Sequence, residues 1–544
     1  MNKNLFLTTF FALIISSCQM KDKVDLIFYN AEVYTVDSMF SKCNAVSVKN
    51  GLIVATGSDD EILNSYRADK YIDLKGKYLY PGFNDAHCHF ISLGEGMLKC
   101  DLRGATSFDE IVERLRNFRT NNLTSFIIGE GWDQNLWHSK SFPSNEKLDI
   151  FFPDIPVVLT RIDFHAVIAN SAAIKMAGLI PGDPSIPQRE ALIRNGKFTG
   201  LFLENTADRI KNALPKLSGS VLENVILAAE GECFKNGLTS VSDAEEELSR
   251  ILVMDSLYSR SKLRIRSDVW LTANDENLNY FKKPYQKERF RVGTLKLYVD
   301  GALGSRGALL KSPYSDDSST SGIRVTSEEN LKEYCKWAFE RGFQVATHCI
   351  GDLANQEALG IYGSILKGEN DRRWRIEHAQ VVDPEDIGLF RKYSVIPSVQ
   401  PTHATSDMVW AVDRLGERIK YAYAYKSLLS QLGWLPSGTD FPIEKVNPIA
   451  TFFSAVYRQN ADFKPDEGFQ MENALSKEEA IRSMTIWPAK ATFEERVKGS
   501  IEKGKYADFV LLDRDLMTVI KKEVLSTKVI MTIIGGEVVY SLLP

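Results

Sequence analysis

The sequence Leu79-Tyr-Pro-Gly-Phe-Asn-Asp-Ala-His-Cys-His-Phe90 contains the clearest chemical signal in the chain. An apolar run passes through a Pro-Gly pair and ends in His87 and His89. Side chains at positions i and i+2 of a β-strand point to the same face, so these two imidazoles can hold one metal ion between them. The alternative is two histidines that are neighbours in a core strand by chance, because His-x-His is a short motif.

Further candidate ligands end short β-like runs elsewhere in the chain. Two of the seven histidines, His348 and His378, end such runs, and Asp440 ends another. A fourth run, residues 294–300, carries Lys296 between apolar neighbours. Imidazole and carboxylate together suit Zn, Fe, Ni or Mn better than Ca or Mg. The pattern therefore predicts one metal centre built from the ends of several strands.

The order of the predicted elements indicates an α/β protein with a parallel barrel. From about residue 222 onward, helix-period segments alternate with short β-like runs, which is typical of βαβ units. Counting from the strand of His87 gives eight strands, the number that closes a (β/α)₈ TIM-type barrel. Active sites of this fold lie at the carboxyl ends of the strands. The candidate ligands fall at the ends of strands one, five, six and eight, with Lys296 on strand four.

The two ends of the chain are predicted to form a separate β unit. Residues 24–78 alternate apolar and polar side chains in short runs separated by Gly and Asn, which favours an antiparallel β unit. Residues 496–544 return to β-like runs and could complete it as a composite β-sandwich. The barrel would then span residues 79–495. An insertion at about residues 92–230, after strand one, lacks further strands that end in histidine, and we expect it to fold over the site.

Residues 1–18 differ from the rest of the chain. Lys3 precedes a short apolar run, which is typical of a secretory signal. The sequence Ile15-Ser-Ser-Cys18 resembles the lipobox of a bacterial lipoprotein. The resemblance implies cleavage before Cys18 and lipid on its thiol, which would tether the protein to a membrane of the bacterial cell envelope through the lipid alone. A plain signal peptide and a mis-assigned start codon are the alternatives. No later apolar stretch reaches the roughly 20 residues of a membrane-spanning helix.

The composition excludes several other classes. The chain has 544 residues, of which 44% are hydrophobic and 25% charged, as in globular proteins. Its formal charge of −5 argues against a nucleic-acid binder. The six cysteines after Cys18 show no disulfide-like spacing, and we expect free thiols.

Taken in order, the motifs resemble the metal-dependent amidohydrolase superfamily, and within it the family-3 branch that includes N-substituted formamide deformylases and YtcJ-like proteins. The resemblance covers about residues 24–540. It rests on Pro81-Gly-Phe-Asn-Asp-Ala-His-Cys-His, Gly131-Trp-Asp, Asp163-Phe-His-Ala-Val-Ile-Ala-Asn-Ser171, Lys296, Asp300-Gly-Ala-Leu-Gly-Ser-Arg306, His348-Cys-Ile-Gly-Asp352, Arg375-Ile-Glu-His-Ala-Gln380, Gln400-Pro-Thr-His403, Ser437-Gly-Thr-Asp-Phe-Pro442 and Gly499-Ser-Ile-Glu-Lys-Gly-Lys-Tyr-Ala-Asp508.

The resemblance implies a hydrolase that cleaves a non-peptide C–N bond with metal-activated water. Asp440 would be the general acid and base, and Lys296 stands where many members carry a carboxylated lysine that bridges two metals. A lysine that simply pairs with a carboxylate or a substrate anion is the alternative. The metal would be one or two divalent ions, with zinc foremost. The implied ligands are His87, His89, Lys296, His348, His378 and Asp440.

The chemistry explains why these residue types are needed. A metal ion lowers the pKa of bound water from 15.7 to about 7 and polarises a carbonyl oxygen. A single carboxylate can take the proton of the water and later give it to the departing nitrogen, because the two transfers occur in sequence. Without its context, Asp440 would be read as an ordinary turn or helix-cap residue.

Four further residues are candidates for substrate contact. His165, in the insertion, could close over the substrate or be an ordinary hydrogen-bonded histidine. His403, after strand seven, lies on the predicted catalytic face. Arg306 could bind a substrate carboxylate or carbonyl through its guanidinium group, or merely cap its loop. Trp132 could form a wall of the pocket or belong to a core.

The substrate and the assembly stay open at this point. The insertion motif has Phe164 where relatives often have Gly, so the deformylase activity cannot be transferred. We expect a small amide, formamide or cyclic amide as the substrate. A hydrolase of C–O or P–O bonds and a non-catalytic barrel that only binds are the alternatives, and a homodimer is not excluded.

Overall fold

The computed structural model describes residues 21–121, 125–162, 165–215 and 217–543. The predicted signal sequence, the predicted lipidation site Cys18 and Phe164 lie outside these residues. Within them, no helix combines the length and the hydropathy needed to cross a bilayer, and the six cysteines are free thiols, as expected.

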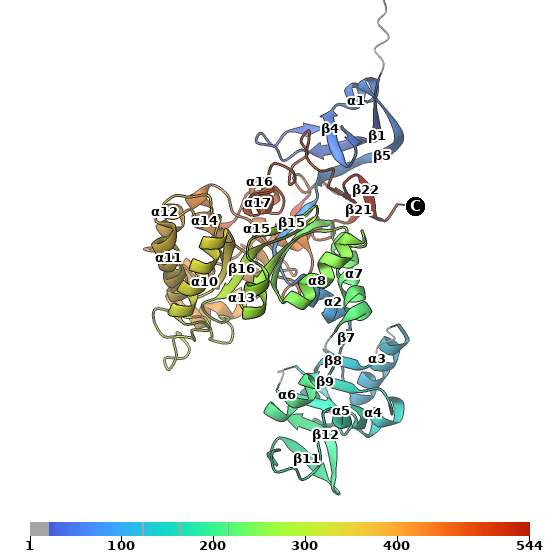
Figure 1. Cartoon of the computed structure of the whole chain (residues 1–544), viewed down its shortest axis with the longest axis vertical. Helices are drawn as coiled ribbons and strands as arrows, with labels where there is room; N and C mark the ends of the chain where they lie inside the picture. Colours follow the sequence, from blue (N-terminus) through green and yellow to red (C-terminus); the bar gives the residue numbers. More distant parts are fainter. Residues whose placement is uncertain (1–20, 122–124, 163–164, 216, 544) are drawn as a thin grey trace, which may run out of the picture.

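Seven parallel strands, each paired with the next in chain order, form the barrel sheet (Figure 1). They are β6 (Phe83–Cys88), β13 (Leu238–Glu246), β14 (Arg266–Thr272), β16 (Phe290–Tyr298), β17 (Gln344–Cys349), β18 (Arg375–His378) and β19 (Ile396–Ser398). The eighth position is taken by residues 435–439. Val399 and Ser437 form a parallel bridge, and the Ala86 amide donates to the Ser437 carbonyl at 3.2 Å. The predicted (β/α)₈ barrel is therefore confirmed, with a very short last strand.

The closure of the barrel depends on the sequence around the last strand. Gly438 lies against β6, where an added Cβ would stand 2.4 Å from the His87 amide nitrogen. Asp85 holds the two segments together, because its carboxylate accepts hydrogen bonds from the Thr439 amide at 3.0 Å and the Thr439 hydroxyl at 2.7 Å. The residue after Thr439 is Asp440, so this clamp fixes the last strand's carboxylate beside His87.

Helices cover the outside of the barrel, and their apolar faces form the largest core of the molecule. Their ends follow ordinary signals: Ser327 caps α10 by accepting from the Asn330 amide, and Gly342 ends α10 with φ of 78°. The covering and flanking helices are α2 (Phe90–Met97), α7 (Gly219–Lys235), α8 (Leu248–Ser259), α9 (Asp275–Tyr280), α10 (Glu328–Arg341), α11 (Asp352–Leu366), α12 (Gly388–Lys392), α13 (Pro401–Leu415), α14 (Tyr425–Leu432), α15 (Pro448–Tyr457), α16 (Lys477–Ser483) and α17 (Ile486–Ala491).

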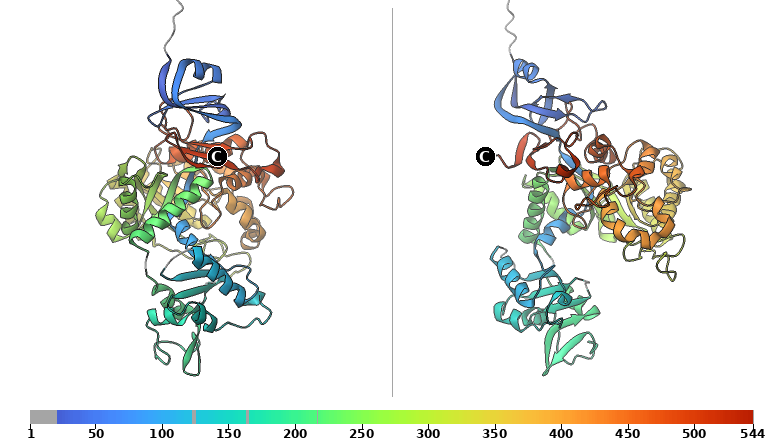
Figure 2. Two further views of the ribbon diagram at one scale, coloured as in Figure 1. Left: turned by 90° about the vertical axis from the view of Figure 1, so that its right-hand side faces the viewer. Right: turned by 180° about the vertical axis from the view of Figure 1, so that it is seen from behind.

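Both chain ends form one β unit, as predicted. The N-terminal strands are β1 (Asp22–Tyr34), β2 (Lys42–Cys43), β3 (Ala45–Lys49), β4 (Leu52–Gly57) and β5 (Tyr66–Pro81), and the C-terminal ones are β20 (Phe509–Leu512), β21 (Val529–Ile534) and β22 (Glu537–Ser541). They share one continuous sheet, in which β20 lies antiparallel to β5. The Ile53 amide also donates to the Lys505 carbonyl at 2.8 Å. The C-terminal residues therefore contact both β5 and β4, which are the two outer strands of the N-terminal part. Figure 2 shows this unit on the opposite side of the barrel from the insertion.

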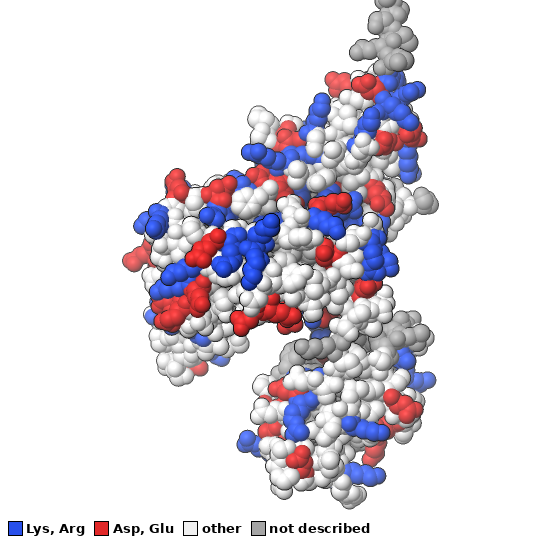
Figure 3. Space-filling view, viewed as in Figure 1, with Lys and Arg blue, Asp and Glu red and all other residues white. Residues whose placement is uncertain are grey.

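The insertion is a body with its own sheet. Its strands are β7 (Lys99–Asp101), β8 (Ile127–Trp132), β9 (Val157–Arg161), β10 (Ala166–Ala169), β11 (Ala191–Arg194) and β12 (Lys197–Leu203), with helices α3 (Phe108–Asn121), α4 (Glu146–Phe151), α5 (Ser171–Met176) and α6 (Glu204–Asn212). It ends earlier than the predicted residue 230, because α7 packs its apolar side chains into the barrel core. Figure 3 shows the insertion set apart from the barrel across an open notch, with acidic and basic side chains interspersed on this face.

Candidate metal centre and active site

A cavity of about 380 Å³ opens at the carboxyl ends of the barrel strands. All six predicted metal ligands line it, and so does His403. The ligands come from the end of β6 and the start of α2, from β16, β17 and β18, and from the loop after residue 439. The barrel therefore brings together residues that are up to 353 positions apart in sequence, as its topology predicts.

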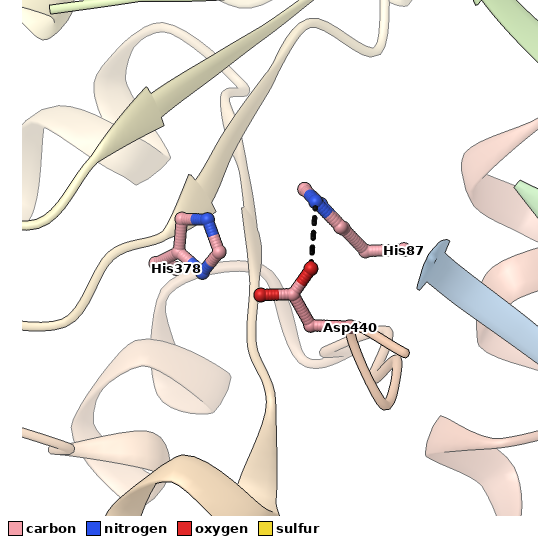
Figure 4. Close-up of side chains that lie close together, drawn as sticks. All are labelled: His87, His378 and Asp440. Carbon is pink, nitrogen blue, oxygen red and sulfur yellow. Dashed lines mark ion pairs between the residues drawn. The ribbon is translucent and has the colours of Figure 1, made fainter. Parts of the chain in front are cut away.

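The tightest group in the cavity consists of His87, His378 and Asp440, whose potential ligand atoms all lie within 4.8 Å of one another (Figure 4). The Asp440 Oδ1 atom lies 3.5 Å from His87 Nε2 and 3.4 Å from His89 Nε2. The Lys296 ammonium nitrogen lies 3.4 Å from His87 Nε2. Asp440 is only 5% exposed, and its Oδ1 has no hydrogen-bond partner among the described residues. These spacings suit a shared cation better than direct hydrogen bonds.

Three of the histidines are oriented by acceptors behind them. The Nδ1 atoms of His87, His89 and His378 contact, in that order, Glu377 Oε2 at 2.6 Å, the Ala244 carbonyl at 3.1 Å and Gln400 Oε1 at 2.8 Å. A carbonyl oxygen, an amide oxygen and an ionised carboxylate can accept a hydrogen bond but cannot donate one. Each Nδ1 atom therefore carries the proton. The Nε2 lone pairs are thereby left facing the cavity, which is the usual arrangement of metal-binding histidines.

The charges of the site suit a divalent cation. Burial, followed by the nearby Lys296 ammonium, lowers the pKa of His87 to about 4 and that of His348 to about 3. Burial alone would raise the pKa of Asp440, but the nearby His89 and then the other imidazoles lower it far below its usual range. Neutral imidazoles beside an ionised carboxylate are the protonation states in which these groups bind metal. The donor set and the unpartnered Asp440 oxygen thus fit a divalent transition-metal ion.

His348 and Lys296 lie at one side of this group. The His348 ring is 4.6 Å from the His378 ring, centroid to centroid, and its Nε2 is 3.7 Å from Asp300 Oδ1. Burial lowers the pKa of Lys296 below its usual range. Both residues line the same cavity as the group of His87, His378 and Asp440.

Sequence reasoning missed the support behind His87. Glu377 is fully buried and lies 2.7 Å from the Arg375 Nε atom, and the Arg375 guanidinium lies 4.7 Å from the Trp270 ring centroid. Burial would raise the pKa of Glu377, but Arg375 and then His87 lower it to about 2. The sequence Arg375-Ile-Glu377 was the available signal. Side chains at i and i+2 of a strand point to the same face, and two opposite charges on one buried face are expected to pair.

We expect Glu377→Gln to weaken metal binding about 10- to 100-fold, because residues that orient a ligating histidine typically contribute that much. Gln cannot offer the negative charge that holds the His87 Nδ1 proton. Chelator competition measures the dissociation constant directly. Glu385→Gln, at an exposed position of the same barrel, is the matched control and should bind metal like the wild type; equal affinity in both variants would contradict the orienting role.

The other three predicted substrate contacts lie outside the cavity. Trp132 is 1% exposed in the insertion's own core, where its Nε1 donates to the Leu159 carbonyl at 2.8 Å. Arg306 forms an ion pair with Asp316, at 2.9 Å between Nη2 and Oδ2. His165 contacts Glu204 at 3.0 Å. None of the described residues that line the cavity comes from the insertion. The prediction that the insertion folds over the site was therefore wrong.

The chain is similar to known proteins over most of its length. The family model described as the amidohydrolase family matches residues 70–540. The protein YtcJ of Bacillus subtilis (strain 168) is 34% identical over 94% of this chain and 99% of its own length. The N-substituted formamide deformylase of Arthrobacter pascens is 25% identical over 95% of this chain and 98% of its own length. The crystal structure of an uncharacterized metal-dependent hydrolase from Pyrococcus horikoshii OT3 covers 91% of this chain and 99% of its own, with 29% identity and a TM-score of 0.77.

Proposed function

Because the chain belongs to the amidohydrolase family, we propose that this hydrolase cleaves a non-peptide C–N bond in a small amide, formamide or cyclic amide, with zinc as its metal and Asp440 as general acid and base. The observation that supports it most is the convergence of three imidazole Nε2 atoms and an unpartnered carboxylate oxygen in one cavity. The deformylase named among the relatives supports the choice of a C–N bond.

The metal would be held by His87, His89, His378 and Asp440, with His348 and a carboxylated Lys296 available to a second ion. When bound, it supplies polarisation of the substrate carbonyl and a lowered pKa for a water molecule beside it. Asp440 Oδ2 is the oxygen that faces His403. We assign to Asp440 the transfer of one proton, taken from the water and then given to the departing nitrogen.

His403 is the protein group best placed to bind the substrate's reacting end. Its Nε2 lies 3.5 Å from Asp440 Oδ2 and has no hydrogen-bond partner within the described chain, although it is buried. An N–H at this position can donate to a carbonyl oxygen on which negative charge develops, which favours the transition state over the bound substrate. His403 therefore serves as the orienting donor in this proposal.

A substrate panel tests the proposal. Full-length protein reconstituted with zinc is given N-alkyl formamides, acetamides and lactams beside esters and phosphate esters of matched size. The proposal expects turnover of one of the C–N classes, lost in Asp440→Asn. Turnover confined to esters or phosphate esters would instead favour a hydrolase of C–O or P–O bonds, the second candidate for the same metal-binding residues.

We also propose that the protein is anchored to a membrane of the cell envelope through lipid on Cys18. The support is the sequence Ile15-Ser-Ser-Cys18 alone. In a bacterial host, wild-type protein should be recovered with membranes and take up labelled fatty acid, whereas Cys18→Ala should take up none. Cys43→Ala is the control that should behave like the wild type, and label in Cys18→Ala would contradict the assignment.

A further inference from the structure

We propose that the cavity selects substrates that carry a protonated amine about one helical turn away from the bond that is cleaved, and that Asp407 and Glu444 bind this amine. The inference rests on the proposed function, because it takes the His87–Asp440 end of the cavity as the reacting end. It adds a substrate class and two specificity-determining residues.

One face of α13 leads outward from the reacting end of the cavity. His403, Asp407 and Trp410 stand at positions i, i+4 and i+7 of this helix, and all three line the cavity. With a rise of 1.5 Å per residue, Asp407 lies about 6 Å and Trp410 about 10 Å beyond His403 along the helix axis. A ligand whose carbonyl lies at His403 therefore extends past Asp407 and then past Trp410.

Asp407 is held in place and still has one oxygen to offer. Its Oδ2 accepts hydrogen bonds from the Tyr423 hydroxyl at 2.8 Å and from Gln380 Nε2 at 3.4 Å. Its Oδ1 accepts none from the described residues, and no described Lys or Arg forms an ion pair with it. Burial raises the pKa of the Asp407 carboxyl; His403 and the Tyr423 hydroxyl partly oppose this rise, and neighbouring Glu444 adds to it. A carboxylate fixed by neutral donors and lacking a cation is suited to receive one from a ligand.

Glu444 supplies a second negative charge at the same part of the cavity. The Ser406 hydroxyl donates to its Oε1 at 2.6 Å, which ties Glu444 to α13. It too forms no ion pair with a described residue. Lys296 is the only lysine or arginine among the described residues that line the cavity, and it lies beside His87 at the other end. The outer part of the cavity is thus acidic, and it would repel a substrate carboxylate.

Trp410 adds an aromatic surface for the same cation, although the Arg414 guanidinium already lies 5.9 Å from its ring centroid. Gly304 packs against its ring so closely that an added Cβ would stand 3.3 Å from the indole. This contact fixes the ring beside the cavity. An indole face attracts a cation within about 6 Å of its centre. Leu303 and Ile350 also line the cavity, and their apolar side chains suit an aliphatic linker. The cavity of about 380 Å³ leaves room for such a ligand beyond the residues that we assign to the metal.

The test measures binding with probes that cannot be hydrolysed. Four methanesulfonamides are titrated by calorimetry into full-length, zinc-loaded protein. Their N-substituents are 4-aminobutyl, pentyl, 4-hydroxybutyl and 4-carboxybutyl. We expect the amine to bind about 10-fold or more tightly than the pentyl compound, a difference of about 1.4 kcal/mol. Asp407→Asn and Glu444→Gln should each reduce this ratio. Asp413→Asn removes a charge from an exposed position of the same helix and should leave the ratio unchanged.

Equal binding of the amine and pentyl probes would overturn the inference. Tighter binding of the hydroxyl or carboxylate probe would also overturn it, and so would the failure of all four probes to bind. If Asp407→Asn does not fold, the Glu444→Gln ratio decides. The substrate panel described under the proposed function separates the two proposals. Hydrolysis without an amine preference overturns only this inference, whereas an amine preference without hydrolysis of any C–N compound overturns only the proposed reaction.

Discussion

Asp440→Asn is expected to lower kcat about 1,000-fold or more, since a positioned acid–base group alone contributes about 100- to 10,000-fold. Asn keeps the size of Asp but cannot take a proton from water or return it to the departing nitrogen. It also removes the one ionised oxygen that lies within 3.5 Å of both His87 and His89. Steady-state kinetics on the substrate found in the panel measures the effect.

The control for this variant is Asp462→Asn, which neutralises an exposed aspartate outside the cavity. It should keep the wild-type kcat. Metal content is measured on the same samples, so that loss of proton transfer and loss of metal can be told apart. A kcat for Asp440→Asn within about 3-fold of the wild type would contradict the role of Asp440, because general acid–base groups contribute far more than that.

Arg375→Met is expected to lower the free energy of unfolding by about 3 to 5 kcal/mol, the usual cost of leaving one partner of a buried ion pair alone. Met fills a similar volume, so the loss is mainly electrostatic. Glu377 would stay buried behind His87 without its guanidinium, and the hydrogen bonds of Arg375 to the Ala86 carbonyl and the Ser398 hydroxyl would also be lost. Denaturant unfolding followed by tryptophan fluorescence measures the change.

The double variant Arg375→Met, Glu377→Gln tests the cause. With the second charge removed, part of the lost stability should return, because no unpaired carboxylate remains in the core. The matched control is Arg414→Met, which breaks an ion pair at a partly exposed site with Asp316 and should cost at most about 1 kcal/mol. A loss for Arg375→Met as small as for Arg414→Met would contradict the account of the buried pair.

The barrel and the metal ligands could be predicted because both follow from local patterns. Histidines and an aspartate at strand ends meet wherever parallel strands close, so the sequence spacing between His87 and Asp440 did not matter. The last strand was also predicted, from the run that ends at Asp440. The need for Gly438 was not predicted, because it arises from the contact of this segment with the backbone of β6.

Other features could not be read from the sequence, because they depend on which surfaces meet. The apolar stripe of α7 has the same pattern whether it packs on the insertion or on the barrel, so the end of the insertion was placed too late. Trp132 and Arg306 belong to chemically plausible motifs, yet one fills a core and the other binds Asp316. Asp407 and Trp410 share a helix face with His403, a spacing that could have been found once α13 was placed at the cavity.

The most direct test of the account is the metal content of the full-length protein, measured by elemental analysis after reconstitution with zinc. Beside the wild type stands the double variant His87→Ala, His378→Ala. We expect about one or two ions per chain in the wild type and almost none in the variant, because two of the ligand imidazoles are gone. Wild-type protein that holds no metal, or a variant that holds as much as the wild type, would contradict it.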